Sequence, residues 1–310
     1  MDTPPLYYDY GSFLRERFPH FKVQKIAVNA GFTCPNRNGE KGWGGCTYCN
    51  NQTFNPAYCD TGLTVTQQIE EGRRFFARKY PDMRYLAYFQ AYTSTYAPLQ
   101  RLVHLYEEAL AAPGVVGLVI GTRPDCMPHD LLDYLVQVQA RGRFVLVEYG
   151  IESVYDSTLR RINRGHDYAC AAEAVERTAR AGLPVGGHVI LGLPGEEVAD
   201  IAAQATVISK LPLTTLKLHQ LQLIRGTRMA QEYARHPEEF HLFAVDEYVE
   251  LVIDYVERLR PDLVVERFVS QSPKALLLAP DWGLKNHEFT DKVRRRMAER
   301  GTFQGRLSQI

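Results

Sequence analysis

Residues 115–149 read VVGLVIGTRPDCMPHDLLDYLVQVQARGRFVLVEY, which is an apolar run, an amphipathic stretch and a second apolar run. The apolar runs Val115–Ile120 and Phe144–Tyr149 are short and rich in Val, Leu and Ile, as is typical of buried parallel strands. Asp130–Ala140 lies between them and has the length and apolar spacing of a helix. This stretch therefore predicts one βαβ unit.

The same alternation continues along the chain in both directions. Further strands are expected at Phe21–Val28, Arg84–Tyr92, Val185–Leu191 and Thr215–Leu223. Further helices are expected at Thr66–Lys79, Leu99–Ala111, Tyr168–Ala181 and Ala199–Ser209, with a short one near Tyr155. The first of these helices is expected to have Ile69, Phe75 and Phe76 on one apolar side. Six strands that alternate with helices predict an α/β fold, a partial (β/α)6 TIM-type barrel with its helices outside. Functional residues in such a barrel lie in loops at the C-terminal strand ends.

The tail of the chain differs in character from this alternation. We expect the barrel to span residues 1–237, including the N-terminal segment, and residues 238–310 to form a small C-terminal extension packed on it. The expected parts of the extension are a helix at Val245–Arg258, a strand at Leu263–Phe268, a surface segment at Ser270–Trp282 and a helix at Asp291–Glu299.

Composition limits the kinds of partner. Hydrophobic residues make up 45% and charged residues 23% of 310, as in ordinary soluble domains. Lys and Arg total 36, as do Asp and Glu, so any surface that attracts nucleic acid must be local. The N-terminus lacks the pattern of a signal peptide, and no apolar stretch approaches the about 20 residues that span a bilayer. We therefore expect a cytoplasmic protein that does not enter the membrane.

Three of the six cysteines lie in one loop directly after the first expected strand. Residues 34–49 read CPNRNGEKGWGGCTYC, a C-x11-C-x2-C spacing of Cys34, Cys46 and Cys49. Thiolates are the ligands that iron–sulfur clusters prefer, and three of them leave one iron of a [4Fe–4S] cluster open to another molecule. Five glycines between residues 31 and 45 suit a loop that wraps closely around an inorganic group.

Two alternative roles for the cysteines stay open. Cys59 lies ten residues after Cys49 and would complete a four-ligand structural zinc site. Three unconnected structural cysteines are a second alternative. Cys126 and Cys170 show no ligand spacing, and free cysteines are commonly buried as small hydrophobic residues.

The cysteine loop resembles that of the radical S-adenosylmethionine (SAM) superfamily, in the YhcC/YtqA-type branch related to the catalytic subunit of Elongator. The resemblance runs through most of the chain, from Tyr7–Gly11 to Thr302–Gly305. It implies that Cys34, Cys46 and Cys49 bind a [4Fe–4S] cluster and that SAM chelates the remaining iron. It also implies reductive cleavage of SAM to a 5′-deoxyadenosyl radical, which takes a hydrogen atom from the substrate.

The same resemblance implies residues that contact SAM, but it assigns no catalytic side chain. These residues are Tyr48, Gln90, Thr93, Arg123, Glu152, Arg164 and Gly192. Tyr48 is expected near the adenine, Glu152 at the ribose hydroxyls and Arg164 at the SAM carboxylate, as a charge-assisted bond. Gly192 ends a strand that lies against the adenine in the family, where a glycine permits close approach of a ligand.

Departures from the family pattern keep alternatives open. The loop around Gln90 and Thr93 lacks the glycines that the family often has there, and Glu152 stands where relatives usually have Gln. Arg123 would instead form an internal ion pair with Asp125, and Glu152 would pair with Arg164. His188 is expected to be a packed barrel residue. The polar residues expected to line a substrate cavity, if they face inward, are His219, Gln220 and Gln222.

The resemblance to Elongator-type enzymes implies a tRNA wobble uridine as substrate, and a flavodoxin or ferredoxin as reductant. A basic helix carries Arg294, Arg295, Arg296 and Arg300, although such a run is more often a solvated helix face. A small metabolite or another protein is an alternative substrate. A non-catalytic metal-binding protein is the alternative from a different class.

Overall fold

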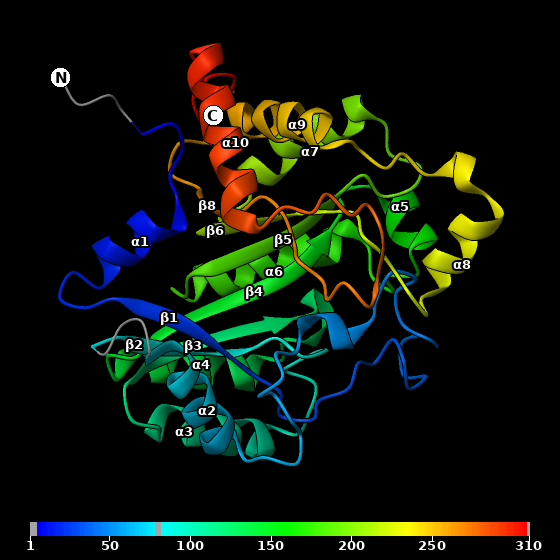
Figure 1. Ribbon diagram of the computed structural model, residues 1–310. Coiled ribbons are helices and arrows are strands. Elements are labelled where there is room, and N and C mark those ends of the chain that lie inside the picture. Colours follow the sequence, from blue (N-terminus) through cyan, green and yellow to red (C-terminus); the bar gives the residue numbers. More distant parts are fainter. Residues whose placement is uncertain (1–4, 78–81, 309–310) are drawn as a thin grey trace.

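The computed structural model describes residues 5–77 and 82–308. Its centre is a sheet of seven parallel strands in the order β1-β2-β3-β4-β5-β6-β8, curled into an open barrel (Figure 1). These strands are β1 (Val23–Val28), β2 (Arg84–Phe89), β3 (Val115–Thr122), β4 (Phe144–Glu152), β5 (Val185–Leu191), β6 (Thr215–Gln220) and β8 (Val264–Arg267). The expected partial TIM-type barrel is therefore confirmed.

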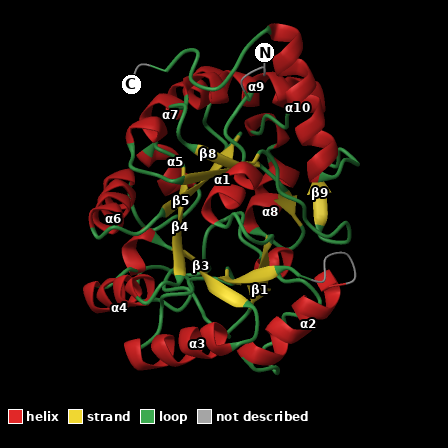
Figure 2. Cartoon of the chain, turned by 90° about the vertical axis from the view of Figure 1, so that its left-hand side faces the viewer, coloured by secondary structure: helices red, strands yellow, loops and turns green. Residues whose placement is uncertain are grey.

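The helices lie mostly around the outer face of the curled sheet (Figure 2). They are α1 (Tyr10–Arg17), α2 (Val65–Ala77), α3 (Leu99–Ala111), α4 (His129–Ala140), α5 (Asp156–Arg161), α6 (Tyr168–Arg180), α7 (Val198–Lys210), α8 (Arg228–Arg235), α9 (Val245–Arg258) and α10 (Asn286–Arg300). A short antiparallel pair joins β7 (Leu223–Ile224) to β9 (Leu277–Ala279). No helix in the described ranges is both long enough and apolar enough to cross a membrane.

The alternation of side chains along β4 shows how the barrel is built. Val145, Val147 and Tyr149 belong to the core shared with the outer helices. Phe144 and Leu146 belong to a separate cluster inside the barrel, because successive strand residues point to opposite faces. Strand β4 is thus apolar on both faces near its N-terminal end, as expected for a central strand of a parallel sheet covered by helices.

Helix α1 covers the N-terminal end of the barrel. It lies within the arc of strands in Figure 2, and Phe13, Leu14 and Phe18 at or next to it pack on the inner cluster. The rings of Phe18 and Phe144 meet edge to face with centroids 5.5 Å apart. The apolar interior is therefore filled at this end, which leaves the opposite ends of the strands for a cavity.

A layer of buried charges lies above the apolar interior. Glu148 of β4 accepts hydrogen bonds from Lys25 of β1 at 2.8 Å and from Lys217 of β6 at 2.5 Å. Glu266 of β8 accepts from Lys25 at 2.8 Å and lies 3.4 Å from Lys217. Lys217 also donates to the hydroxyl of Tyr88 on β2 at 2.9 Å. Two lysines and two glutamates thus join strands from both edges of the sheet.

The C-terminal part of the chain supplies the seventh strand. The strand expected at Leu263–Phe268 is present as β8, and it pairs in parallel with β6 inside the barrel sheet. The sheet is therefore one strand larger than the six expected. The division between residues 1–237 and 238–310 stays a prediction, since the second part contributes both this strand and helices packed outside.

Two sequence predictions for local structure were wrong. Strand β2 ends at Phe89 and does not continue to Tyr92, whose φ of 57° is incompatible with a strand. The apolar side expected for α2 includes Ile69, which is fully buried, but Phe75 is 68% exposed. Residues Arg78 and Lys79, expected at the end of this helix, lie outside the described residues.

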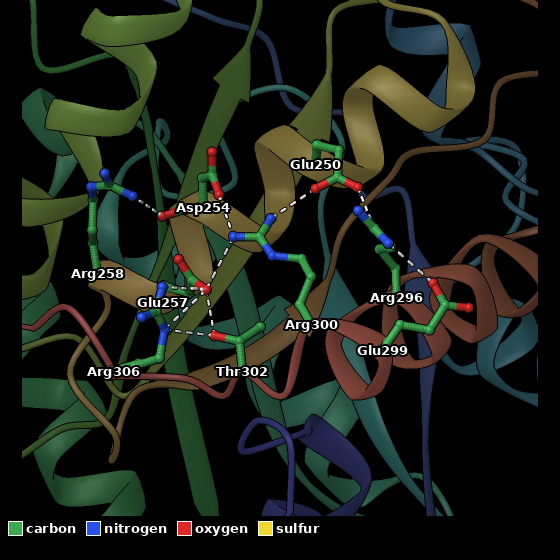
Figure 3. Close-up of polar contacts among 9 residues, drawn as sticks. All are labelled: Glu250, Asp254, Glu257, Arg258, Arg296, Glu299, Arg300, Thr302 and Arg306. Carbon is green, nitrogen blue, oxygen red and sulfur yellow. Dashed lines mark hydrogen bonds and ion pairs between the residues drawn. The ribbon is translucent and has the colours of Figure 1, made fainter.

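Helix α10 is attached to α9 by a network of ion pairs (Figure 3). Arg300 contacts Glu250, Asp254 and Glu257 of α9 at 2.8, 2.9 and 3.2 Å. Arg296 contacts Glu250 at 2.5 Å. Much of the basic run on α10 is therefore neutralised by carboxylates of α9, which weakens its interpretation as a nucleic-acid surface.

Candidate active site

A cavity opens at the C-terminal ends of the strands, where the cysteine loop lies. Nine of the ten site residues expected from the sequence line this cavity, which are Cys34, Cys46, Cys49, Tyr48, Gln90, Thr93, Arg123, Glu152 and Arg164. Gly192 is not among the lining residues. Its φ is 90°, and a β-carbon there would lie 2.9 Å from the ring of Phe243, so close packing explains the glycine.

The cysteine loop is attached to the loop after α5. The fully buried Asn36 donates through Nδ2 to the carbonyl of Asn163 at 2.6 Å. Asn163 in turn donates through Nδ2 to the carbonyl of Gly45 at 2.8 Å, and the backbone of Gly45 donates to Asn36 at 2.8 Å. These reciprocal bonds hold the segment before Cys46 against a second loop from across the barrel mouth.

Polar hydrogens point toward the sulfur of Cys46. Arg164 Nη1 lies 3.6 Å and Asn36 Nδ2 lies 3.8 Å from this Sγ atom. Arg37 donates through Nη2 to the carbonyl of Cys49 at 3.0 Å. N–H donors around sulfur stabilise thiolates and tune the iron–sulfur clusters that such thiolates hold.

The three thiols fit a cluster better than a single zinc ion. Four sulfurs around zinc would lie roughly 3.8 Å apart, since each Zn–S bond is about 2.3 Å. Within the described residues, the three loop sulfurs do not all lie within 4.8 Å of one another. Burial and the neighbouring Cys46 raise the pKa of Cys49 to about 11, so a positively charged group is needed to hold this thiol as a thiolate.

Cys59 does not join the three loop cysteines. It is buried, its Sγ donates to the carbonyl of Ala27 at 3.1 Å, and it does not line the cavity. Burial raises the pKa of this thiol to about 12. The geometry therefore gives no support to the zinc alternative in which Cys59 supplies the fourth ligand.

Within residues 5–77 and 82–308, three residues other than glycine have a positive φ; two of them line this cavity, and the third bonds to the cysteine loop. They are Tyr92 at 57°, Glu152 at 68° and Asn163 at 53°. Glu152 follows an irregularity in the pairing of β4 with β5, which turns the strand end. Such backbone strain persists only where surrounding contacts enforce it, and it is concentrated at functional sites.

Glu152 and Arg164 form an ion pair within the cavity wall, with Nη2 and Oε1 3.5 Å apart. Arg164 also donates to the carbonyl of Gly150 at 2.6 Å. A β-carbon on Gly150 would lie 2.4 Å from the Glu152 carboxylate and 2.6 Å from the guanidinium. The glycine is therefore needed for the pair. Burial raises the pKa of Glu152, although Arg164 opposes this shift.

Arg123 forms the internal ion pair that the sequence left as an alternative. Its Nε and Nη2 donate to the two carboxylate oxygens of Asp125 at 2.9 and 3.0 Å. A third bond runs from Nη1 to the carbonyl of Arg164 at 2.8 Å. Burial alone would raise the pKa of Asp125, but the bonds from Arg123 hold it well below its usual range. Arg123 thus supports the Arg164 loop while lining the cavity.

The loop after β2 places its polar groups at the same opening. Thr93 is buried, and its backbone donates to the carbonyl of Thr33, next to Cys34, at 3.2 Å. Within the described residues, its Oγ1 atom has no hydrogen-bond partner. Tyr48 packs on the apolar cluster that includes Ile190 and Leu221, so this ring borders the side of the cavity formed by β5 and β6.

The polar residues of β5 and β6 face inward, which answers the question of sidedness that the sequence left open. His219, Gln220 and Gln222 line the cavity together with His188, whose ring stacks on His219 with centroids 5.2 Å apart. His188 Nε2 lies 3.1 Å from a carboxylate oxygen of Glu148. Burial and the nearby Lys217 lower the pKa of His188 to about 4, so this ring is neutral at pH 7.

Several site residues were missed in the sequence. They are Arg37, Glu148, Arg267, Ser270 and Ser272, which line the cavity, and Asn36, whose Nδ2 atom lies 3.8 Å from the Cys46 sulfur. The segment from Ser270 was expected on the surface, but the backbone of Ser270 donates to Gln220 at 2.7 Å and its start lines the cavity. A usable signal was present for Glu148, because a charged residue within an apolar strand requires a partner.

Comparison with known proteins agrees with this geometry. The sequence pattern of the radical SAM superfamily matches residues 31–205, and that of the radical SAM C-terminal domain matches residues 213–299. The chain belongs to the radical SAM superfamily. The cofactors expected from the sequence, a [4Fe–4S] cluster and SAM, are those of this family, and the three-thiol cavity fits them.

Similar proteins are found at two levels of identity. This radical SAM chain is 35% identical to YtqA of Bacillus subtilis, over 99% of this chain and 94% of that protein. It is also 35% identical to YhcC of Escherichia coli, over 88% of this chain and 86% of that protein. The tRNA uridine(34) acetyltransferase of Methanocaldococcus infernus is 25% identical over 60% of this chain and 34% of that protein.

A solved structure supports the fold alone. The Elp3 protein of M. infernus, with an N-terminal deletion, superposes with a TM-score of 0.69 at 16% identity. The match covers 92% of the radical SAM chain and 64% of that protein chain. Both parts of the present chain are therefore arranged as in a larger relative.

Proposed function

We propose that this radical SAM enzyme modifies the base of a tRNA uridine at the wobble position. The observation that carries the chemistry is the cavity at the strand ends, which brings Cys34, Cys46 and Cys49 together with the Glu152–Arg164 pair. When bound, the cluster and SAM would supply a 5′-deoxyadenosyl radical that takes a hydrogen atom from the substrate. A flavodoxin or ferredoxin would supply the electron.

The protein has defined tasks around these cofactors. The three thiolates would hold three irons of the cluster, and N–H groups of Arg164 and Asn36 would stabilise the Cys46 sulfur. Glu152 would accept bonds from ribose hydroxyls, and Arg164 would bind the SAM carboxylate. Tyr48 would pack at the adenine, while Gln90 and Thr93 offer polar groups to the SAM amino group. Contact between the backbone near Gly192 and the adenine stays a prediction, since Gly192 is not among the residues that line the cavity.

The tRNA substrate is supported by similarity to a relative whose name states that activity. The match covers 34% of that relative, so acetyl transfer is not carried over to this chain. The zero formal net charge and the ion-paired α10 provide no broad basic surface. We therefore propose that RNA contacts are local to the cavity mouth.

The cluster is tested by replacing one loop cysteine. After anaerobic reconstitution we expect about four iron atoms per chain in the wild type and production of 5′-deoxyadenosine from SAM with dithionite. Cys46→Ala should lose most of the iron and all SAM cleavage, whereas Cys170→Ala, outside the cavity, should keep both. Equal iron content and SAM cleavage in Cys46→Ala and wild type would contradict the assignment.

The substrate is tested by deleting the gene and analysing the nucleosides of bulk tRNA by mass spectrometry. A uridine derivative that disappears or accumulates, and recovers with wild type but not with Cys46→Ala, would support the proposal. An unchanged nucleoside profile, with SAM cleavage intact in the purified enzyme, would point to a small metabolite or a protein as substrate instead.

A further inference from the structure

Arg267 at the end of β8 lines the cavity without a carboxylate partner among the described residues. The ion pairs among residues 5–77 and 82–308 do not include it, and its Nε atom has no hydrogen-bond partner there. Its guanidinium instead faces His219, whose two ring nitrogens lie 3.4 Å from Nη2. Of the other cavity arginines, Arg123 and Arg164 each pair with a carboxylate, whereas Arg37 donates to the carbonyl of Cys49 and lies over the ring of Tyr92 on the cysteine-loop side.

The charges beneath Arg267 do not compensate it. In the buried layer the positive charges of Lys25 and Lys217 balance the negative charges of Glu148 and Glu266. Arg267 therefore adds one unbalanced positive charge to this half of the cavity. A partly buried cation without a counter-ion is costly, and an anionic ligand would remove that cost.

Hydroxyl and amide groups surround the same position. Gln220 exchanges two hydrogen bonds with the backbone of Ser270, at 2.7 and 3.0 Å, and so holds the segment after β8 over the cavity. Ser272 donates through Oγ to Gln222 Oε1 at 2.7 Å. The Ser270 hydroxyl contacts Nδ1 of His219. These neutral polar groups line the same cavity as the guanidinium, and an anion would replace some of the bonds that they now make with one another.

The position also differs from the place proposed for SAM. The residues proposed to contact SAM lie on the cysteine loop, at the ends of β2, β3 and β4, and on the loop after α5. Arg267 lies on β8, which pairs with β6 and is none of these elements. One cavity thus has two chemically distinct walls.

We propose that Arg267, with Ser270, Ser272 and Gln222, binds an anionic group of the substrate, a phosphate or a carboxylate. A guanidinium matches both groups through paired N–H donors. The inference rests on the proposed function, because it treats this cavity as the place where substrate meets SAM. For a nucleic-acid substrate the group would be a backbone phosphate beside the base that enters the cavity.

The test compares small anions on the reconstituted, SAM-saturated protein. Inorganic phosphate and acetate are each compared with chloride at equal ionic strength, and the Tm is recorded. At roughly ten times its dissociation constant, the preferred anion should raise the wild-type Tm by about 2 °C relative to chloride. Arg267→Gln should lose most of this shift, and Arg267→Lys should keep part of it. Arg295→Gln, an exposed arginine on α10, should keep all of it.

The outcomes separate the possible ligands. A larger shift with phosphate identifies a phosphate group, and a larger shift with acetate identifies a carboxylate. No shift with either anion in the wild type, or an equal shift in wild type and Arg267→Gln, would overturn the proposal. Loss of SAM binding in both Arg267 variants would also overturn it, because the arginine would then hold SAM. Each of these results decides whether Arg267 binds an anion, and none of them depends on tRNA being the substrate.

Discussion

Glu196 is a carboxyl group buried where the loop after β5 meets the end of β4. Ser153, the neighbour of Glu152, donates its hydroxyl to this carboxylate. Burial raises the pKa of Glu196 to about 7, because a charge is poorly solvated there. A single residue next to the site is therefore expected to link the stability of the folded chain to pH.

The sign of this effect follows from the direction of the shift. Between the ordinary carboxyl pKa and about 7, the folded chain holds a proton that the unfolded chain has lost, so stability falls as pH rises. We expect a loss of about 2–3 kcal/mol in the free energy of unfolding between pH 4.5 and 7.5 from this group. Urea unfolding across this range should show that Glu196→Gln removes most of the slope.

The exposed Glu173→Gln serves as the control for this measurement and should retain the slope of the wild type. A Glu196→Gln variant with an unchanged slope would mean that this carboxyl is ionised in the folded protein at neutral pH.

At the scale of elements, α9 and α10 are joined by charges whose burial differs. Glu257 of α9 is 1% exposed and accepts from Arg306 at 3.0 Å, from Arg300 at 3.2 Å and from Thr302. Arg300 is 22% exposed and bridges the three carboxylates of α9 in Figure 3, those of Glu250, Asp254 and Glu257. These two residues form the buried part of the network, and Arg296 and Glu299 form its exposed edge.

We expect Arg300→Met to lower the free energy of unfolding by about 2 kcal/mol, because it leaves a buried carboxylate with fewer partners. Arg295→Met, on the exposed face of the same helix, should change it by less than about 0.5 kcal/mol. Urea denaturation followed by circular dichroism measures both. Equal effects of the two variants would show that solvent, and not Arg300, compensates Glu257.

At the scale of the whole molecule, the layer of Lys25, Glu148, Lys217 and Glu266 connects the two edges of an open sheet. These residues come from β1, β4, β6 and β8, which are far apart in the sequence. Burial outweighs the attraction of Glu148 and lowers the pKa of Lys217 to about 8. Glu148 keeps a depressed pKa, since both lysines offset its burial. Below the barrel mouth, the ionisation of each side chain in this layer therefore depends on the charges of the others.

Removing one charged side chain of this layer should lower the free energy of unfolding more than removing an oppositely charged pair. We expect Lys217→Met to lower the free energy of unfolding by about 3–5 kcal/mol, because Glu148 then lacks one of its two lysines. Adding Glu148→Gln should restore part of this loss, since Lys25 and Glu266 remain balanced. A double-mutant cycle by urea unfolding measures the coupling. Strictly additive losses would show that the two side chains do not depend on each other.

Much of the fold could be predicted because periodic patterns are local. The strands at residues 115–120 and 144–149 were found within a few residues of their observed ends. The wrong predictions occurred where tertiary contacts override pattern. Strand β2 stops early because the site requires Tyr92 in a left-handed conformation, and β8 joins the sheet from a segment that follows the alternating pattern.

The sequence by itself indicated the family, the three cysteines expected to hold a cluster and the alternation that builds a barrel, since spacing and periodicity are properties of neighbouring residues. Only the tertiary structure decided which charges are paired. It joined Arg123 to Asp125 and Glu152 to Arg164, and within the described part of the chain it left Arg267 without a carboxylate. Two charged groups pair only if they lie close together in space. The strands that carry these groups come close only when the sheet curls.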